Sequence, residues 1–399
     1  MIKLYGSVDK AAGWNETFLG RVTHDRHAPV AIRRKLALLS DECPDPEVCR
    51  QFGLVLVRDA STVSPIHNVH KLPDWASYLA HGDVIHLAPS GLLGVLFRVA
   101  ARSNSILVTE RCSSNCIMCS QPPKAKADTD LYDLAIAAIE HIPANTAQIG
   151  VTGGEPLIDV RRFLSLVHRC RTHLPRTALH VLTNGRLLSY LRYAQSIAAV
   201  RHPDLMFGIP LYSAVAARHD FVVQARGAFD QTVRGILAAK RFGLRVEIRV
   251  VLHRQTVEEL GLLAEFIRRN LPFVDHVALM GLEHIGYVKM NQGALKMQPQ
   301  TSAEEIVEFV ELLDGAGLRT SIYNMPHCWI PEPAWRFLRQ SISDWKNDFP
   351  TECGDCSMKQ TCCGFFSWNV AESRELVRPI RPITTRSLTA TGVTTGETS

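Results

Sequence analysis

The sequence lacks a long apolar run, a block of basic residues and a strong excess of either charge. Its most hydrophobic stretch, residues 84–101, contains His86, Pro89 and Arg98 and is short for a bilayer crossing. The first residues, MIKLYGSVDK, do not include the apolar segment of a secretory signal. The 44 basic and 39 acidic residues give a net charge of only +5, without the concentrated positive charge of a nucleic-acid-binding protein. We therefore expect a soluble, cytoplasmic protein that binds neither membrane nor nucleic acid.

Cysteine, by contrast, is abundant, with 11 residues in the chain. A reducing compartment keeps thiols free, so this number predicts metal binding or catalysis rather than disulfides. The placement favours metal binding, because three cysteines lie within residues 112–119 and five within residues 328–363. We assign no role to the other three, Cys43, Cys49 and Cys170.

Apolar runs and helical patterns alternate regularly from residue 105 onward. Between the runs, apolar residues recur at spacings of three and four, which predicts amphipathic helices. Such alternation predicts an α/β fold with a parallel sheet and right-handed crossovers. Six units fit a partial (β/α)6 barrel, whose chemistry is expected at the C-terminal ends of the strands. The runs expected to form strands are residues 105–109, 147–152, 178–183, 205–211, 244–252 and 276–280.

The composition divides the chain into four predicted regions. Residues 1–104 mix polar turns with short apolar runs, such as 54–57 and 84–87, and predict a small domain that contains β-structure. Residues 105–300 form the predicted barrel, and residues 301–370 form a cysteine-rich extension. Residues 371–399 have little apolar content, so we expect a disordered tail.

The first group of cysteines, Cys112, Cys116 and Cys119, lies in the segment TERCSSNCIMCSQPP with C-x3-C-x2-C spacing. The segment follows the first predicted barrel strand, and its thiolates can fold around one metal centre. Thiolates select zinc or Fe–S clusters. Structural zinc sites usually have four ligands, and no histidine follows at a near spacing. Three ligands therefore favour an Fe–S cluster with one iron open to a small molecule, and the alternative is three ordinary reduced thiols.

This motif resembles that of the radical S-adenosylmethionine (SAM) superfamily, which carries the same loop after the first strand of a partial barrel. The resemblance implies a [4Fe–4S] cluster bound by Cys112, Cys116 and Cys119, with SAM chelating the open iron. In that family, an electron from the cluster cleaves SAM to a 5′-deoxyadenosyl radical that abstracts hydrogen from the substrate. Met118 departs from the aromatic residue that usually precedes the last cysteine.

A second motif, GVTGGEPL, ends the second predicted strand and contains Gly153, Gly154, Glu155 and Pro156. The glycines allow the backbone to approach a ligand closely, and the carboxylate can bind a cationic amine. The resemblance implies that this motif holds the amine of SAM, whereas alone it could be an ordinary turn.

Later strand ends supply further candidates for binding SAM. For Arg249, an ion pair inside the barrel is an open alternative, and Glu283 is either a substrate contact or an exposed loop carboxylate. By the same resemblance, the expected positions are Asn184, Ser213, Arg249, Met280 and Gly281.

The second group of cysteines lies in ECGDCSMKQTCCGFF, with Cys328 upstream in YNMPHCWIP. We expect Cys328, Cys353, Cys356 and Cys362 to close a four-thiolate site that holds an auxiliary [4Fe–4S] cluster or zinc. Cys363 is left over, because adjacent cysteines rarely bind the same metal. The arrangement resembles a shortened SPASM or twitch-type extension, which implies an auxiliary cluster, and a structural metal knuckle is the alternative.

Longer phrases between residues 80 and 368 extend the resemblance. SNSILVTERC, HVLTNGR, RVEIRVVLH and FVDHVALMGLE look like the C-type radical SAM maturase of the His-Xaa-Ser peptide system. That resemblance implies a precursor peptide with His-Xaa-Ser repeats as substrate, a second radical SAM maturase, and a reductase or other electron donor. Two alternatives stay open: a radical SAM enzyme that acts on a small metabolite, and a non-catalytic zinc-binding scaffold.

Overall fold

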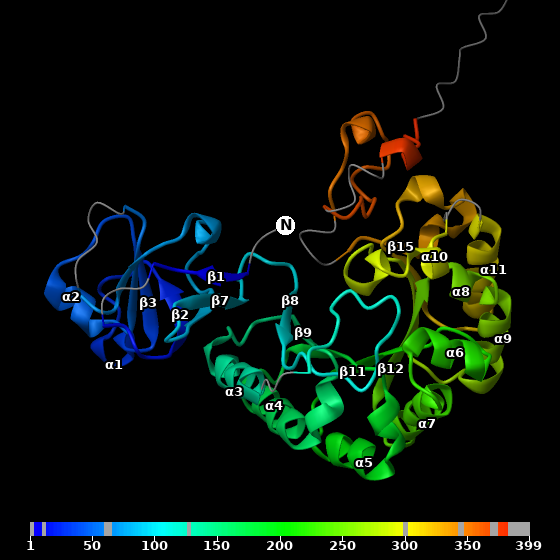
Figure 1. The fold of residues 1–399 in the computed structure, drawn as a ribbon, viewed down its shortest axis with the longest axis horizontal. Coiled ribbons are helices and arrows are strands. Elements are labelled where there is room, and N and C mark those ends of the chain that lie inside the picture. Colours follow the sequence, from blue (N-terminus) through cyan, green and yellow to red (C-terminus); the bar gives the residue numbers. More distant parts are fainter. Residues whose placement is uncertain are drawn as a thin grey trace, which may run out of the picture.

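The computed structural model describes residues 4–9, 13–59, 66–125, 129–297, 302–341, 347–367 and 374–381. Two separate sheets organise these residues (Figure 1). Among the described helices, none is both long enough and apolar enough to span a bilayer.

The first sheet is mixed and has seven strands in the order β1-β7-β6-β2-β3-β4-β5. The apolar runs at 54–57 and 84–87 form β4 and β6, as predicted. Buried side chains cover the sheet in two clusters, one around Trp14 and Phe18 and one around Cys49 and Phe52. The elements are β1 (Tyr5–Ser7), β2 (Phe18–Thr23), α1 (Val30–Arg33), β3 (Leu36–Ser40), α2 (Pro46–Gln51), β4 (Leu54–Val57), β5 (Val69–Lys71), β6 (Val84–Leu87) and β7 (Leu92–Phe97).

The second sheet is parallel throughout and curls into a half-barrel with its helices on the outer side (Figure 1). Its strands follow one another in chain order, which confirms the predicted α/β architecture with a curled parallel sheet. The strands are β8 (Asn104–Leu107), β9 (Gln148–Thr152), β10 (Ala178–Leu182), β11 (Leu205–Pro210), β12 (Arg245–Leu252), β13 (His276–Gly281), β14 (Thr320–Tyr323) and β15 (Leu338–Arg339).

The number of strands differs from the prediction. Six of the eight strands coincide with the six apolar runs, but β14 and β15 lie in the region expected to be a cysteine-rich extension. These two strands have only four and two residues, too few to produce a periodic pattern. The half-barrel is therefore longer at this edge than the sequence predicts.

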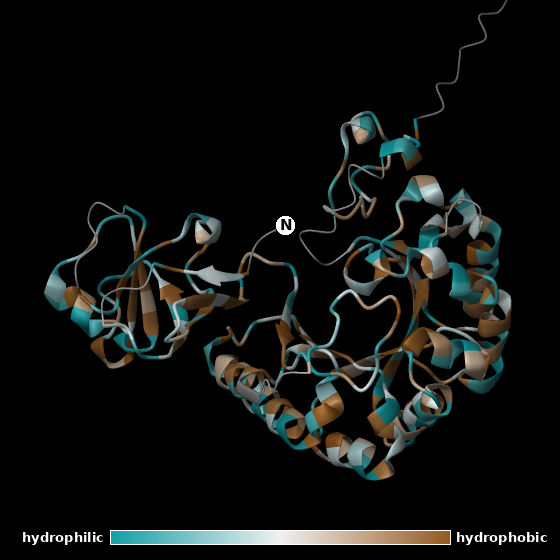
Figure 2. Ribbon diagram, in the orientation of Figure 1, coloured by the Kyte–Doolittle hydropathy of each residue, from teal (hydrophilic) through white to brown (hydrophobic). Residues whose placement is uncertain are grey.

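Amphipathic helices bury their apolar faces against the outer side of the second sheet. In α4, Phe163, Leu166, Val167 and Cys170 recur at helical spacing and are fully buried, so Cys170 is a small apolar core residue. Figure 2 shows the same division, with apolar strands inside and mixed helices outside. The helices are α3 (Thr129–Ala138), α4 (Val160–His173), α5 (Leu191–Ala199), α6 (Ala216–Val223), α7 (Ala228–Arg241), α8 (Arg254–Val257), α9 (Leu260–Asn270), α10 (Gln292–Leu295) and α11 (Ala303–Gly315).

The cysteine-rich segment after β15 has little regular structure. A bridge joins Asp348 to Phe365, and short 3-10 helices form at Thr351–Cys353 and Arg374–Leu376. Of the predicted tail, residues 374–381 contact this segment, and the Ser357 amide donates to the carbonyl of Ile380 at 2.9 Å. Residues 382–399 lie outside the described residues.

Helix α7 packs closely against the 3-10 helix η5 (Arg186–Ser189), and a substitution at this contact should change the stability of the protein. A Cβ added at Gly235 in α7 would overlap the carbonyl oxygen of Gly185. We expect Gly235→Ala to lower the free energy of unfolding by about 1–3 kcal/mol, because overpacking outweighs the better helix propensity of alanine. Urea denaturation followed by circular dichroism measures the free energy of unfolding.

Gly261 in α9 is a matched control, because an added Cβ there meets nothing within 4 Å. Gly261→Ala is expected to raise the free energy of unfolding by up to about 1 kcal/mol. A Gly235→Ala protein as stable as Gly261→Ala would contradict the packing described here.

Candidate functional site

The three cysteines of the first group lie on a loop that leaves the C-terminal end of β8. Burial raises the pKa of Cys112 to about 11 and that of Cys116 to about 12, and it also raises the pKa of Cys119. Cys116 is also affected by the charges of Cys119 and Cys112, so the three thiols lie within electrostatic reach of one another. The structure therefore brings together the three residues that the spacing predicted as ligands.

The donor set fits an Fe–S cluster better than a single ion. Within the described ranges, no three His, Cys, Asp or Glu side chains are arranged to hold one metal ion. Each thiolate of a four-iron cluster binds a different iron, so its ligands are spread around the cluster rather than converging on one point. Three soft thiols within electrostatic reach of one another match a [4Fe–4S] cluster with one open iron.

The GGEP motif holds the cysteine loop directly. The amide of Gly154 donates to the carbonyl of Thr109 at 2.8 Å, and the amide of Glu155 donates to that of Arg111 at 2.8 Å. A Cβ at Gly153 would lie 2.7 Å from the Thr109 carbonyl oxygen, and one at Gly154 would overlap that of Arg111. The close approach that these glycines permit is thus toward the backbone of the cysteine loop, rather than toward a ligand as the sequence suggested.

Glu155 is fully buried and joins the ends of two strands. Its carboxylate accepts hydrogen bonds from the Leu157 amide (2.8 Å), the Thr183 hydroxyl (2.6 Å) and the Asn184 amide (2.7 Å). Burial raises the pKa of Glu155, and these three donors oppose that rise. A carboxylate has about four acceptor positions, so one is left for a further donor such as an amine. Pro156 begins the 3-10 helix Pro156–Asp159, and its carbonyl accepts from the hydroxyl of Tyr132.

The end of β10 contributes a cation that sequence reasoning missed. Nη1 of Arg186 donates to the Ser113 carbonyl at 2.6 Å and to Oγ of Ser114 at 2.9 Å, both between the first two cysteines. Nδ2 of Asn184 donates to Oγ of Ser113 at 3.0 Å. The charge of the guanidinium also lowers the pKa of Cys116, although burial has the larger effect and raises it. The signal was available, since Arg186 directly follows the TNG turn that ends the strand.

Ser213 and Arg249 are engaged with neighbouring side chains. The buried Ser213 hydroxyl donates to Oε2 of Glu259 at 2.6 Å. Arg249 donates through Nη1 to Oε1 of Glu247 at 2.9 Å and through Nη2 to Sδ of Met280 at 2.9 Å. Of the two alternatives for Arg249, the structure has the ion pair inside the barrel.

Gly281 and Tyr212 complete the surroundings of the loop. A Cβ at Gly281 would overlap the carbonyl oxygen of Asn324, so this glycine packs against the loop after β14. Tyr212, also missed, is buried among Ile117 and Val222 beside Cys116. Burial raises its pKa well above the usual value, and the charges of all three cysteines add to that rise.

The four expected ligands of the second site also interact. The charges of Cys328, Cys356 and Cys362 all raise the pKa of Cys353, after the larger effect of burial, which brings it to about 11. Cys328 is likewise affected by Cys362 and Cys356. The structure thus brings Cys328 within electrostatic reach of Cys353, Cys356 and Cys362, which lie close together further along the sequence.

Cys363 has a different role from the other four. Its thiol donates to the carbonyl of Gly364 at 3.3 Å, and the Gly364 amide donates to the sulfur of Cys362 at 3.4 Å. The neighbouring Cys363 thiol, with donors from His327 and the Gly364 amide, lowers the pKa of Cys362 to about 4 despite burial. The neighbouring Cys362 sulfur and burial raise the pKa of Cys363 well above its usual value. Cys363 therefore lies beside an expected ligand, and its own thiol is hydrogen-bonded to a backbone carbonyl.

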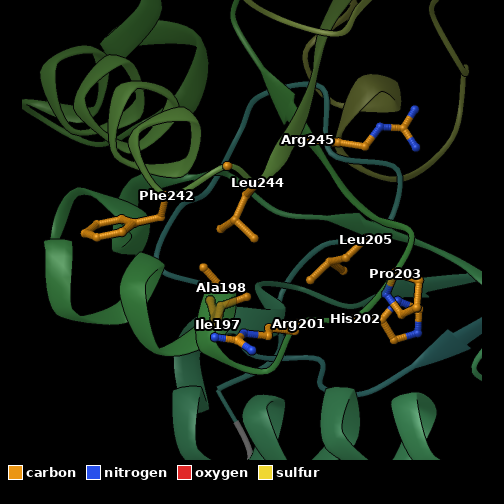
Figure 3. A pocket seen from close by; sticks show the side chains of 10 residues that line it. Ile197, Ala198, Arg201, His202, Pro203, Leu205, Phe242, Leu244 and Arg245 are labelled. Atoms are coloured by element: carbon orange, nitrogen blue, oxygen red, sulfur yellow. The ribbon is translucent and has the colours of Figure 1, made fainter.

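A pocket of about 190 Å³ lies at the other end of the strands (Figure 3). Leu205 and Arg245 line it, and they are the first residues of β11 and β12. Because the cysteine loop leaves the C-terminal end of β8, this pocket is not part of the site.

Residues 106–267 match the sequence profile of the Radical SAM superfamily. This part of the chain, which contains most of the half-barrel, is therefore similar to the radical SAM superfamily. This similarity supports a radical SAM enzyme with a [4Fe–4S] cluster and SAM over a non-catalytic scaffold. The matched residues include all three cysteines of the loop and the GGEP motif.

The curated relatives that match this chain are named GTP 3′,8-cyclase, whereas the sequence resembled a peptide maturase. The chain is 28% identical over 196 residues to a GTP 3′,8-cyclase of Bradyrhizobium diazoefficiens, covering 47% of this chain and 55% of the relative. It is 26% identical over 207 residues to a probable GTP 3′,8-cyclase of Methanocella arvoryzae, covering 51% and 64%. The chain therefore spans between about half and two thirds of the length of these relatives.

Solved structures with a similar barrel include SuiB of Streptococcus suis bound to S-adenosylmethionine, with 16% identity and a TM-score of 0.43, covering 57% of this chain and 51% of that one. Another is anSMEcpe with bound AdoMet and the Cp18Cys peptide, with 17% identity and a TM-score of 0.41, covering 55% and 62%.

The contacts of Arg186 generate a prediction about the cysteine loop. Arg186→Lys removes the planar fork that joins the loop to Gln231, whose Oε1 accepts from Nε at 2.7 Å. We expect iron to be lost to a chelator about tenfold faster, since hydrogen bonds from a charged group contribute about 1.5–3 kcal/mol. Arg192→Lys is the control, because the described contacts of the Arg192 guanidinium are with the rings of Tyr190 and Tyr193 and the Tyr193 hydroxyl, away from the loop. Equal rates of iron loss in both variants would show that Arg186 does not hold the loop.

Proposed function

We propose that this protein is a radical SAM enzyme that modifies a ribosomally made peptide, a precursor with His-Xaa-Ser repeats. The observation that carries the proposal is the second set of four interacting thiols, next to the superfamily barrel. Cys328 follows β14 by one short loop, so this set is attached at the C-terminal end of the strands, where the cysteine loop also lies. The sequence resemblance to the C-type maturase supports the same substrate class.

In this proposal, Cys112, Cys116 and Cys119 hold the catalytic cluster. When bound, the cluster and SAM supply a carbon radical that takes hydrogen from the substrate. Glu155 offers its remaining acceptor position to the amine of SAM, and Asn184 keeps the cysteine loop against β10.

The apolar side chains beneath the loop exclude water from the radical. Ile117, Tyr212, Val222, Val223 and Val288 form a buried cluster against Cys116 and Met118. Ser213, Met280 and Gly281 border this region as candidate contacts for the remaining parts of SAM.

In this proposal the second site holds an auxiliary [4Fe–4S] cluster on Cys328, Cys353, Cys356 and Cys362, and the expected alternative, zinc, is disfavoured because no three described donor side chains are arranged around one ion. A reductase or other electron donor would supply electrons, and a second radical SAM maturase would act on the same precursor. The neighbouring thiol of Cys363 lowers the pKa of Cys362 and so favours the thiolate that a metal binds.

A second candidate function is the modification of a small molecule, favoured by the curated relatives named GTP 3′,8-cyclase. Their similarity extends over 196 to 207 residues, about the size of the barrel region, so it supports the barrel's chemistry more than a substrate.

Anaerobic reconstitution with iron, sulfide, SAM and dithionite tests the two substrate classes side by side. One reaction contains a synthetic peptide with His-Xaa-Ser repeats and the other contains GTP. We expect a mass change of the peptide that depends on SAM, and unchanged GTP. A cyclised GTP product with unmodified peptide would overturn the proposal.

The catalytic loop gives a matched pair of cysteine variants. Cys116→Ala should abolish formation of 5′-deoxyadenosine, because two thiolates do not retain the cluster, while circular dichroism shows an intact fold. Cys170→Ala removes a buried thiol in α4 and should keep cluster and turnover. Turnover of SAM by Cys116→Ala would count against the mechanism.

The second site provides another matched pair of cysteine variants. Cys362→Ala should remove the metal of this site, whereas Cys363→Ala should keep it, because only Cys362 is a ligand in our assignment. Metal analysis of each variant measures this. Loss of the same amount of metal from both variants would mean that Cys363 is also a ligand.

A further inference from the structure

The segment that follows β13 lies directly against the cysteine loop. It contains the 3-10 helix η6 (Gly286–Lys289) and continues into α10. The Tyr287 amide donates to the carbonyl of Cys119 at 2.9 Å, and Nδ2 of Asn291 donates to the carbonyl of Ile117 at 2.9 Å. Two hydrogen bonds therefore join this segment to the backbone of the loop, at and just before the third cysteine.

Gly286 permits this close contact. Its φ of +61° lies in the left-handed region, which favours glycine, and an added Cβ would overlap the carbonyl oxygen of Cys119. Val288 and Leu295 fix the rest of the segment, because both are buried in the apolar cluster that packs against Cys116. The segment is thus anchored on the loop from η6 to the end of α10.

The outer side of the same segment is exposed. Lys289 directly follows the buried Val288, and Lys296 directly follows the buried Leu295. Successive side chains on a helix differ in direction by about 100°, so each lysine leaves the apolar cluster and is exposed. Met290 is 73% exposed, the largest value among the described large apolar side chains. The segment therefore presents a methionine between two lysines to solvent.

Helix α8 extends this surface. Nε2 of Gln255 in α8 donates to the carbonyl of Ala294 in α10 at 3.1 Å, so the two short helices lie side by side (Figure 1). Arg254 is the first residue of α8 and is exposed. The exposed residues of this surface, which we call the η6–α10 face, are Lys289, Met290, Lys296 and Arg254.

The three cations of the η6–α10 face are not neutralised by the rest of the described chain. Lys289, Lys296 and Arg254 make no ion pair or side-chain hydrogen bond with any other residue that the structure describes. The carboxylate of Glu258, at the C-terminal end of α8, is paired with Arg218 at 2.6 Å. The face therefore has a local excess of positive charge, although the net charge of the whole chain is only +5.

We propose that the η6–α10 face docks an acidic one-electron carrier protein, which reduces the cluster held by the cysteine loop. The inference rests on the proposed function, in which each cleavage of SAM needs one electron. Unpaired cations attract an acidic partner and raise the rate of encounter between the two proteins. The exposed methionine between the cations gives the complex an apolar centre within a polar rim.

Hydrogen bonds also connect this face to the site of reduction. The Met290 amide donates to the carbonyl of Tyr287 at 3.1 Å, and the Tyr287 amide donates to that of Cys119. One short stretch of backbone thus separates the docked carrier from an expected ligand of the cluster.

The step is a simple electron transfer. The carrier is oxidised by one electron and the cluster is reduced by the same electron. No bond forms or breaks, and no proton moves. The role of the face is therefore to bind and orient the carrier, which is a property that can be measured apart from peptide modification.

Calorimetric titration of flavodoxin, an acidic FMN protein, into the anaerobically reconstituted protein tests the face without turnover. We expect the double variant Lys289→Glu with Lys296→Glu to raise the Kd about tenfold at low ionic strength, because repulsion replaces attraction. Added salt should weaken binding by the wild type more than binding by this variant. The same Kd for both proteins, or no binding by the wild type, would overturn the proposal.

A matched control changes the net charge by the same amount at another place. Arg34 and Lys35 are exposed next to β3 in the first sheet, so Arg34→Glu with Lys35→Glu should bind flavodoxin as the wild type does. In stopped flow, reduced flavodoxin should reduce the cluster about tenfold more slowly in the variant of the η6–α10 face. Photoreduced deazaflavin, a small uncharged reductant, should act equally on all three proteins. Slower reduction by both reductants would mean that the variant damages the loop, and would contradict the docking role.

Failure of this inference is distinguishable from failure of the proposed function. If the wild type takes an electron from flavodoxin but leaves the peptide unmodified, the substrate assignment fails, and the binding data still decide the docking role. If the peptide is modified with deazaflavin as reductant, and the variant of the face binds flavodoxin like the wild type, the docking role fails alone. Displacement of flavodoxin by the peptide with His-Xaa-Ser repeats would assign the η6–α10 face to the substrate and would also overturn the proposal.

Discussion

The site depends on hydrogen bonds that hold an irregular loop between the ends of three parallel strands. The cysteine loop has no helix or strand of its own, so its shape is set by neighbours: the amides of Gly154 and Glu155 from β9, and the side chains of Asn184 and Arg186 from β10. Backbone amides and a planar guanidinium have fixed directions, so these contacts restrict where the three thiols can lie. Glu155, after β9, joins the end of β10 through two hydrogen bonds, from the Thr183 hydroxyl and the Asn184 amide.

Burial disfavours the thiolate forms of the loop cysteines, and these are the forms that bind a cluster. The thiols of Cys112 and Cys116 have raised pKa values, so assembly of the cluster must displace protons from groups that hold them firmly. The same burial keeps water away from a radical, because Tyr212 and Ile117 pack beneath the loop. Assembly of the cluster and protection of the reaction are therefore opposing demands on the same apolar side chains.

Sequence patterns predicted those features that repeat or that have a fixed spacing. The six apolar runs are strands, and both cysteine groups contain thiols that interact in space. The four-residue β14 and the two-residue β15 were missed because they are too short for periodicity. The sequence left the partners of Arg249 open, because they depend on long-range pairing of strands. The register of β12 against β13, which puts Glu247 beside His276, is such a pairing. Likewise, the glycines of the GGEP motif were expected to face a ligand, since nothing in the sequence shows that the carbonyl of Arg111 lies against them.

The central claim is that three cysteines leave one iron of a cluster open to SAM. Electron–nuclear double resonance of the reduced, anaerobically reconstituted protein tests it most directly, with SAM labelled with 17O in its carboxylate. The account predicts hyperfine coupling between the label and the cluster signal, because the carboxylate would bind the open iron. A cluster signal without coupling to the label, or a protein without iron at the loop, would contradict it.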